Sequence, residues 1–249
     1  MPTEDLIPYD GQSTKQQTYA FQSRVGSVIY PSVLARPDSA FAGQKLSEFL
    51  VNPGPKHLDA ANHAIAYLNG SRTMAIEYND LSYDPLFLCA SDAAFADNIE
   101  TRRSTEGYYF QLFGGPIDWR STKQKTVTTS TTEAELYALS HTAGQLYWWQ
   151  RFFNAISLDL RDQFPLQCDN LQTVRLLIKD SPKLITKLKH VDIHQHWLRQ
   201  EVQLKNLQVE WIPTHKMKAD GFTKNLPRQK HEQFVRQLGL VDIKAYIAE

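Results

Sequence analysis

Apolar residues recur at helical spacing through the first 70 residues of the chain. They form three stretches, at residues 21–30, 39–50 and 56–68, which turn-forming residues separate. In the third stretch Leu58 and Ile65 lie seven residues apart, which is two helical turns. The pattern predicts three short helices in this part of the chain.

From residue 74 onward the apolar residues follow the pattern of strands. Segments 74–78 and 86–90 are short and apolar, and segment 107–119 is rich in tyrosine and phenylalanine, with a bend at Gly114. Segment 126–129 is rich in β-branched residues, so we expect it to continue the strand signal.

The remainder alternates between helical and strand patterns. Helices are predicted at 133–156, 170–179, 190–202 and 219–240, the last with a turn at Pro227, and strands at 164–168 and 207–212. Several strands followed by alternating helices and strands predict an α/β fold, with a mixed sheet flanked by helices.

Composition and charge add limits to this picture. The chain has 249 residues, and its formal net charge is +0, so any surface that binds nucleic acid must be a local one. Cys89 and Cys168 are the two cysteines, and their spacing suits neither a disulfide framework nor a zinc site. We expect an intracellular protein, either cytoplasmic or nuclear. We also expect it to be soluble, with no membrane partner, because no apolar run approaches the roughly 20 residues of a membrane span.

Four carboxylates stand where predicted strands and helices begin or end. Asp92 and Asp169 each follow an apolar strand, Glu135 lies in the first turn of the long helix, and Asp220 opens the last helix. Carboxylates that converge at strand ends repel one another unless cations bind among them, and oxygen ligands suit Mg²⁺ or Mn²⁺. Helix capping explains the same residues individually, so their positions alone leave both interpretations open.

Glu133 competes with Glu135 for a place in such a site. Two residues apart on a helix, they point in nearly opposite directions, so only one can join a single metal site. Glu135 adjoins the apolar face that Leu136 and Leu139 define. We therefore expect Glu135 to be the ligand.

A series of segments in this chain resembles the ribonuclease H (RNase H) domain of copia-type retrotransposons. They follow in the same order over about residues 85–230 and include Ser-Asp-Ala at 91–93, Arg-Arg-Ser-Thr at 102–105, Thr-Glu-Ala-Glu at 132–135, Cys-Asp-Asn at 168–170, Lys-His-Val-Asp-Ile at 189–193 and Ala-Asp-Gly-Phe-Thr-Lys at 219–224. The resemblance implies an RNase H-like mixed five-stranded sheet. It also implies a metal-binding and catalytic set made of Asp92, Glu135, Asp169 and Asp220.

The N-terminal portion is similar to the thumb-like segment that joins polymerase and nuclease in these polyproteins. The matching segments are 24–30, 35–38, 49–53 and 56–57, and no pair of adjacent aspartates typical of a polymerase is present. The resemblance thus implies a C-terminal piece of such an element, or a gene derived from one. The expected organisation is a polar tail at 1–17, a helical thumb or connection segment at 18–80, an RNase H-like domain at 85–225 and a C-terminal helical extension at 226–249.

The resemblance also implies an activity. Two Mg²⁺ ions, replaceable by Mn²⁺, would support hydrolysis of the RNA strand of an RNA–DNA hybrid, which the domain would recognise by its shape and its 2′-hydroxyls. The polymerase portion of a reverse transcriptase is a possible partner. The alternative is a catalytically silent module, derived from a retroelement, that binds nucleic acid or protein.

Further residues are candidates for nucleic-acid contact. We expect these polar and basic side chains to approach the phosphate backbone: Arg102, Arg103, Lys123, Lys125, Asn170 and Lys189. Ordinary solvated surface residues remain the alternative. His215 follows the last predicted strand and resembles the mobile histidine of retroviral RNase H, which implies a role in proton transfer or product departure.

Overall fold

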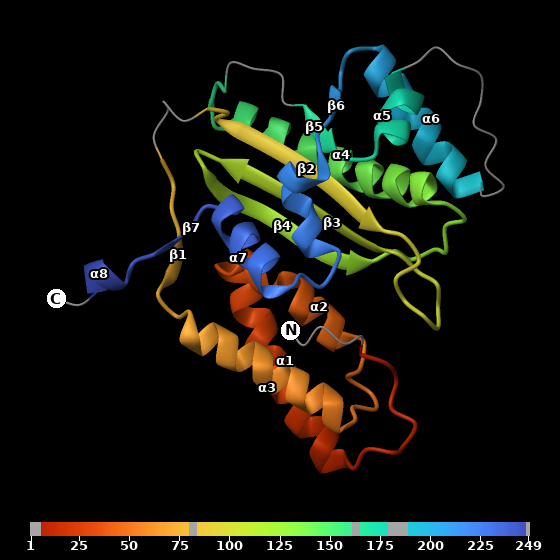
Figure 1. Cartoon of the computed structure of the whole chain (residues 1–249). Coiled ribbons are helices and arrows are strands. Elements are labelled where there is room, and N and C mark those ends of the chain that lie inside the picture. The colour runs from red at the N-terminus through yellow and green to blue at the C-terminus, as the bar shows by residue number, and fades with distance from the viewer. Residues whose placement is uncertain (1–5, 80–83, 161–164, 179–188, 248–249) are drawn as a thin grey trace. The chain divides into compact units, whose positions relative to one another are not determined.

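The computed structural model describes residues 6–79, 84–160, 165–178 and 189–247 (Figure 1). The chain forms two compact units. One comprises residues 1–77 together with 224–249, and the other comprises residues 78–223. No helix of the described ranges has the length and apolarity that are needed to cross a membrane.

The first unit begins with the three predicted helices, which the structure confirms. They are α1 (Lys15–Leu34), α2 (Ala40–Ser47) and α3 (Pro55–Gly70), with a short 3₁₀ helix, η1 (Pro37–Ser39), before α2. The helices bury Phe21, Val25 and Leu46 in a common core. Helix α1 begins within the predicted polar tail, because Thr14 and Gln17 form a capping box at its first turn.

The C-terminal segment completes this unit. It contains α7 (Arg228–Gln237), β7 (Leu240–Asp242) and α8 (Lys244–Ile247). Strand β7 pairs antiparallel with β1 (Met74–Ile76), so that Met74 lies opposite Asp242. The helical prediction for residues 219–240, with a turn at Pro227, is confirmed for α7, which begins directly after that turn, and is wrong at Leu240, where the chain enters β7.

The second unit holds a five-stranded mixed sheet in the order β4-β3-β2-β5-β6. The strands are β2 (Phe87–Ala94), β3 (Thr105–Leu112), β4 (Gly115–Lys123), β5 (Leu166–Cys168) and β6 (Val209–Trp211). Strands β2, β3 and β4 are antiparallel neighbours, whereas β5 pairs parallel with both β2 and β6. This order and these directions confirm the predicted RNase H-like sheet.

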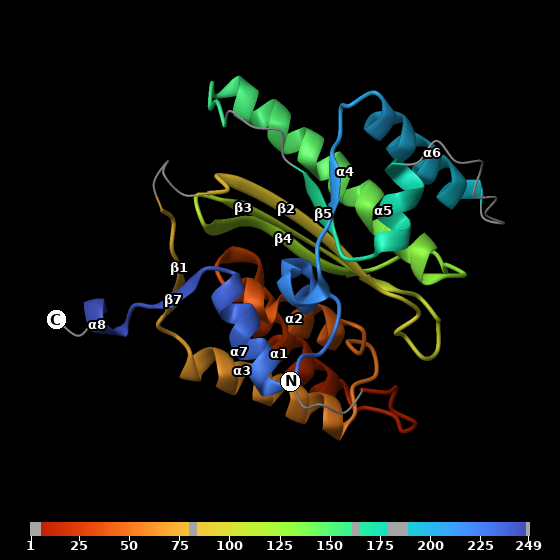
Figure 2. The same cartoon turned by 45° about the horizontal axis from the view of Figure 1, so that its top comes forward.

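Three helices cover one face of this sheet: α4 (Thr131–Ala155), α5 (Leu171–Ile178) and α6 (Lys189–Gln203) (Figure 2). Side chains of β2 alternate between the two faces. Cys89 joins the core under α4 and Ser91 accepts a hydrogen bond from Thr142 of that helix (3.0 Å), whereas Ala90 packs with Met217 on the other face. Asp92 shares the face of Ala90.

Two details of the predicted strands are wrong. Asp92 does not follow its strand but lies within it, because pairing with β3 continues to Ala94. Segment 126–129 is not a strand. Its last residue, Thr129, instead donates from its backbone N–H to the Glu133 carboxylate (2.6 Å) at the start of α4, so capping overrides β propensity here.

Candidate metal centre

Three carboxylates converge at one end of the sheet. Asp92, Glu135 and Asp169 each offer an oxygen, and these oxygens all lie within 4.8 Å of one another. Cys89 pairs with Leu166 in the parallel β2–β5 ladder, and the same register continued to the strand ends places Asp169 level with Asp92. Strand pairing thus explains how two residues that are 77 positions apart become neighbours.

Glu135 reaches this cluster from the second turn of α4. Glu133 is used differently, because its carboxylate accepts hydrogen bonds from the backbone N–H and the hydroxyl of Thr129, both at 2.6 Å. Its own backbone N–H donates to Ser130 Oγ, the N-cap of α4, at 3.2 Å. The two glutamates therefore divide into a helix cap and a member of the acidic cluster, in the register that helical geometry predicted.

Asp220 lies in η3 (Lys218–Phe222), a 3₁₀ helix rather than the start of a long helix. It is not a member of the three-carboxylate group. Thr223 connects the two regions, since its hydroxyl donates to the Asp92 carboxylate and lies 3.1 Å from the Asp220 carbonyl oxygen. Thr223 thereby holds Asp92 against the segment that carries Asp220.

Gly107 is a further residue that shapes the site. It lies opposite Asp92 in the β2–β3 ladder. A Cβ at this position would meet Phe222 Cβ at 2.6 Å and Thr223 Cγ2 at 3.1 Å, so the close approach of η3 to the sheet requires glycine. Sequence reasoning missed both Gly107 and Thr223. A glycine inside an otherwise aromatic strand was the available signal, since such a glycine often marks a close backbone approach.

The negative charge of the cluster affects the pKa of the neighbouring residue Cys168. This thiol is fully buried, and burial together with the negative charges of Glu135, Asp169 and Asp92 raises its pKa. Asp92 and Glu135 are themselves buried, each with 5% of its surface exposed. Negative charge is therefore concentrated in a poorly solvated place, which favours cation binding.

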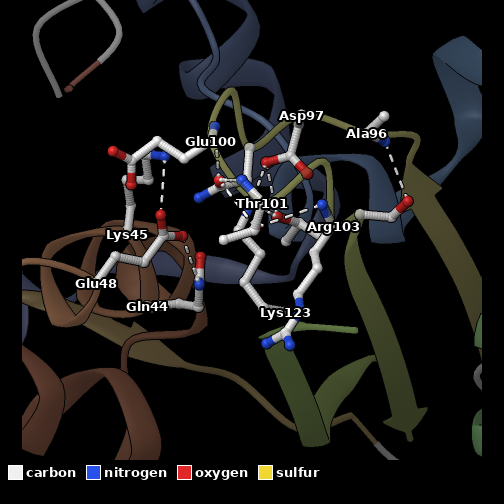
Figure 3. A network of polar contacts seen from close by, with 12 residues as sticks. Gln44, Lys45, Glu48, Ala96, Asp97, Glu100, Thr101, Arg103 and Lys123 are labelled. Atoms are coloured by element: carbon white, nitrogen blue, oxygen red, sulfur yellow. Dashed lines mark hydrogen bonds and ion pairs between the residues drawn. The ribbon is translucent and has the colours of Figure 1, made fainter. Parts of the chain in front are cut away.

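The predicted contacts to nucleic acid lie in several places. Arg102 and Arg103 are exposed on the loop between β2 and β3. Lys123, in contrast, is engaged by its neighbours: Nζ lies 2.5 Å from Asp97 Oδ2 and 2.7 Å from Thr105 Oγ1 (Figure 3). A phosphate would have to compete with Asp97 for this lysine.

The other candidates also differ in their surroundings. Asn170 Oδ1 accepts a hydrogen bond from the Thr173 backbone N–H (3.1 Å), so Asn170 caps α5. Lys125 is exposed, and so is His215, which lies in the 3₁₀ helix η2 (Thr214–Lys216) after β6. The side chain of Lys189 lies outside the described residues.

Comparison with known sequences gives clear relatives, although no family model matches the chain. The chain is 34% identical to the Retrovirus-related Pol polyprotein from transposon TNT 1-94 of Nicotiana tabacum. This match extends over 220 residues, which are 88% of the chain. The chain is 31% identical over 245 residues to the corresponding polyprotein from transposon RE1 of Arabidopsis thaliana, which covers 97%. The chain spans only 16% of the length of either polyprotein.

A shorter relative matches half of the chain. Secreted RxLR effector protein 161 of Plasmopara viticola is 41% identical over 128 residues, which are 51% of this chain and 89% of that protein. Among solved structures, LC11-RNase H1 in complex with an RNA/DNA hybrid aligns with a TM-score of 0.41 and 16% identity, over 55% of this chain and 93% of its own. From the polyprotein matches and the RNase H-like sheet together, the chain belongs to the copia-type retrotransposon Pol family and corresponds to the C-terminal reverse transcriptase and RNase H region.

Proposed function

We propose that residues 78–223 form a metal-dependent endonuclease that cleaves the RNA strand of RNA–DNA hybrids, within a retrotransposon polyprotein or a protein derived from one. The observation that carries this proposal is the convergence of Asp92, Glu135 and Asp169, whose oxygens lie within 4.8 Å of one another. The family membership supports it, since its relatives are retrovirus-related Pol polyproteins.

The donor set fits a hard divalent cation. All three groups are carboxylates, and oxygen ligands of this kind suit Mg²⁺ or Mn²⁺ rather than zinc. Two of them are buried, so the cluster gains from a cation that offsets their mutual repulsion. Asp92, Glu135 and Asp169 would hold the metal, with Asp220 as a fourth ligand. When bound, Mg²⁺ supplies Lewis acidity toward water and toward the scissile phosphate.

The chain's own residues have defined tasks in this proposal. Thr223 orients the Asp92 carboxylate by donating a hydrogen bond from its hydroxyl group to it. His215, exposed on the loop after β6, would accept or release a proton near the leaving group. Phosphoryl transfer depends mainly on positioning and charge neutralisation. Basic side chains around the site would therefore position the phosphate backbone of the hybrid.

The test uses the whole chain and a hybrid with labelled RNA. We expect cleavage in Mg²⁺, no cleavage in EDTA, and survival of single-stranded RNA and duplex DNA. Asp92→Asn and Asp169→Asn should each abolish cleavage, whereas Glu100→Gln, a change at an exposed carboxylate of the same unit, should leave it unchanged. A parent chain that binds the hybrid without cutting it would favour a silent binding module. Active aspartate variants would show that the site is misassigned.

A further inference from the structure

A cavity of about 280 Å³ lies on the α4 side of the β3–β4 pair. Arg120 and Thr122 of β4 line it from the sheet, and Tyr137, His141 and Gln145 line it from α4. The three helix residues are spaced by four, so they form one stripe along α4. Strand β4 and helix α4 therefore form two of its walls.

Positive charge predominates in this cavity. Arg120, Lys123 and Lys125 line it, and among the described residues of the lining Glu106 is the single carboxylate. The Glu106 carboxylate is turned toward protein partners, since one oxygen lies 2.7 Å from His141 Nδ1 and the other accepts a hydrogen bond from Gln124 Nε2 at 3.3 Å.

Two of the three cations are presented to solvent. Lys123 is engaged by Asp97, as described above. Arg120 and Lys125 are both exposed, and Arg120 also has a hydrogen bond with the Tyr108 side chain of the same lining. A planar guanidinium beside a flexible ammonium is a combination that suits phosphate oxygens, because arginine offers paired donors and lysine a point charge.

The size of the cavity limits what it can hold. Pockets for drug-sized ligands span about 300–1,000 Å³, and this one falls just below that range. A single phosphate group fits such a space better than a whole nucleotide cofactor does.

We propose that this cavity binds a backbone phosphate of the nucleic-acid duplex, at a place separate from the three carboxylates. The proposal rests on the proposed function for the identity of the duplex. His141 lies six residues beyond Glu135 on α4, which corresponds to about 9 Å along the helix axis. A duplex carries one phosphate per roughly 3.4 Å of axis on each strand, so a hybrid at the carboxylates extends far enough to place another phosphate near the cavity.

The experiment measures binding without metal, so that cleavage does not interfere. A fluorescein-labelled RNA–DNA hybrid is titrated by anisotropy at several salt concentrations with the parent chain and with the double variant Arg120→Gln, Lys125→Gln. Each lost phosphate contact reduces the slope of log K against log salt by about 0.9, so loss of the single phosphate held in the cavity should lower the slope by about 0.9. The matched control is Arg151→Gln, Lys205→Gln, which removes two exposed cations elsewhere in the same unit and should leave the slope unchanged.

Two further arms make the outcome decisive. The charge-preserving pair Arg120→Lys, Lys125→Arg should retain most of the parent slope, which separates lost charge from lost folding. If the salt-dependence slope of the Arg120→Gln, Lys125→Gln variant equals that of the control variant, the proposed phosphate site is overturned. A parent that fails to cut the hybrid but shows the expected slope difference contradicts the proposed activity and still supports the phosphate site.

Discussion

Asp92 and Gly107 lie opposite each other in the β2–β3 ladder, and the missing side chain of Gly107 is what allows η3 to approach the sheet beside Asp92. Phe222 occupies the space that a Cβ would take, and Thr223 then reaches the Asp92 carboxylate. A glycine with no chemistry of its own thus determines how one carboxylate of the cluster is held.

Gly107→Ala should therefore destabilise the second unit. The added Cβ would lie 2.6 Å from Phe222 Cβ, so η3 must shift, and overpacking of this kind costs about 1–3 kcal/mol. We expect a lower unfolding midpoint in urea. Gly144→Ala is the matched control, because its Cβ would meet nothing within 4 Å and a helical alanine is favoured over glycine by up to about 1 kcal/mol. A Gly107→Ala protein as stable as the parent would refute this account.

Glu133→Gln and Glu135→Gln should have opposite consequences. Glu133 binds the Thr129 backbone N–H and hydroxyl, so its replacement should cost up to about 1 kcal/mol of stability while cleavage persists. Glu135→Gln should remove detectable cleavage. It should not lower the thermal midpoint, because it relieves repulsion among the three carboxylates. Melting curves and hybrid cleavage rates of the two variants separate these effects, and a larger catalytic loss at Glu133 would reverse the assignment.

His215→Ala should slow turnover by roughly 10- to 100-fold, at or below the usual contribution of an acid–base group, which is on the order of 10²–10⁴-fold. The side chain is exposed in η2, outside the acidic cluster, so metal affinity should stay close to that of the parent. Steady-state rates on a hybrid, together with Mg²⁺ titrations, distinguish this variant from Asp169→Asn, which should lose both. Unchanged turnover would make His215 an ordinary surface residue.

Lys218 should make the stability of the protein depend on alkaline pH. Burial lowers the pKa of this amine to about 8, while its ammonium group donates to Gln111 Oε1 and lies 5.5 Å from the centre of the Tyr109 ring. The folded pKa lies below the unfolded value of 10.5, so the unfolded chain binds the proton more tightly. The resulting reduction in the free energy of unfolding is fully present below about pH 8 and disappears as the pH rises toward 10.5.

Lys218→Met should consequently raise the free energy of unfolding at pH 7 by about 1–2 kcal/mol, since the lost hydrogen bond to Gln111 offsets part of the gain. The advantage over the parent should shrink between pH 8 and pH 10.5. Urea denaturation of both proteins across this range measures the difference. Lys216→Met, at an exposed lysine nearby, is the control and should show no such trend.

Local patterns predicted most of the elements correctly, because helices and strands bury their apolar residues at characteristic spacings. They failed where a distant partner decided the outcome. Residues 91–94 carry little apolar signal, yet pairing of Ala94 with Thr105 extends β2 through them. Strand β7 has only three residues and forms because β1, more than 160 positions earlier in the chain, pairs with it.

The sequence by itself determined which residues are candidates for the proposed chemistry. Asp92, Glu135 and Asp169 were recognisable from their motifs, and helical spacing together with the apolar face of the helix favoured Glu135 over Glu133. Only the tertiary structure decided which groups meet: the parallel register of β2 and β5 brings Asp169 level with Asp92. Gly107 leaves the space that η3 needs to approach the sheet. Arg120 and Lys123 both line the cavity beside α4, but Lys123 forms an ion pair with Asp97. The physical reason is that periodicity and capping act over one or two turns of chain, whereas convergence depends on strand register and close packing between segments far apart in sequence.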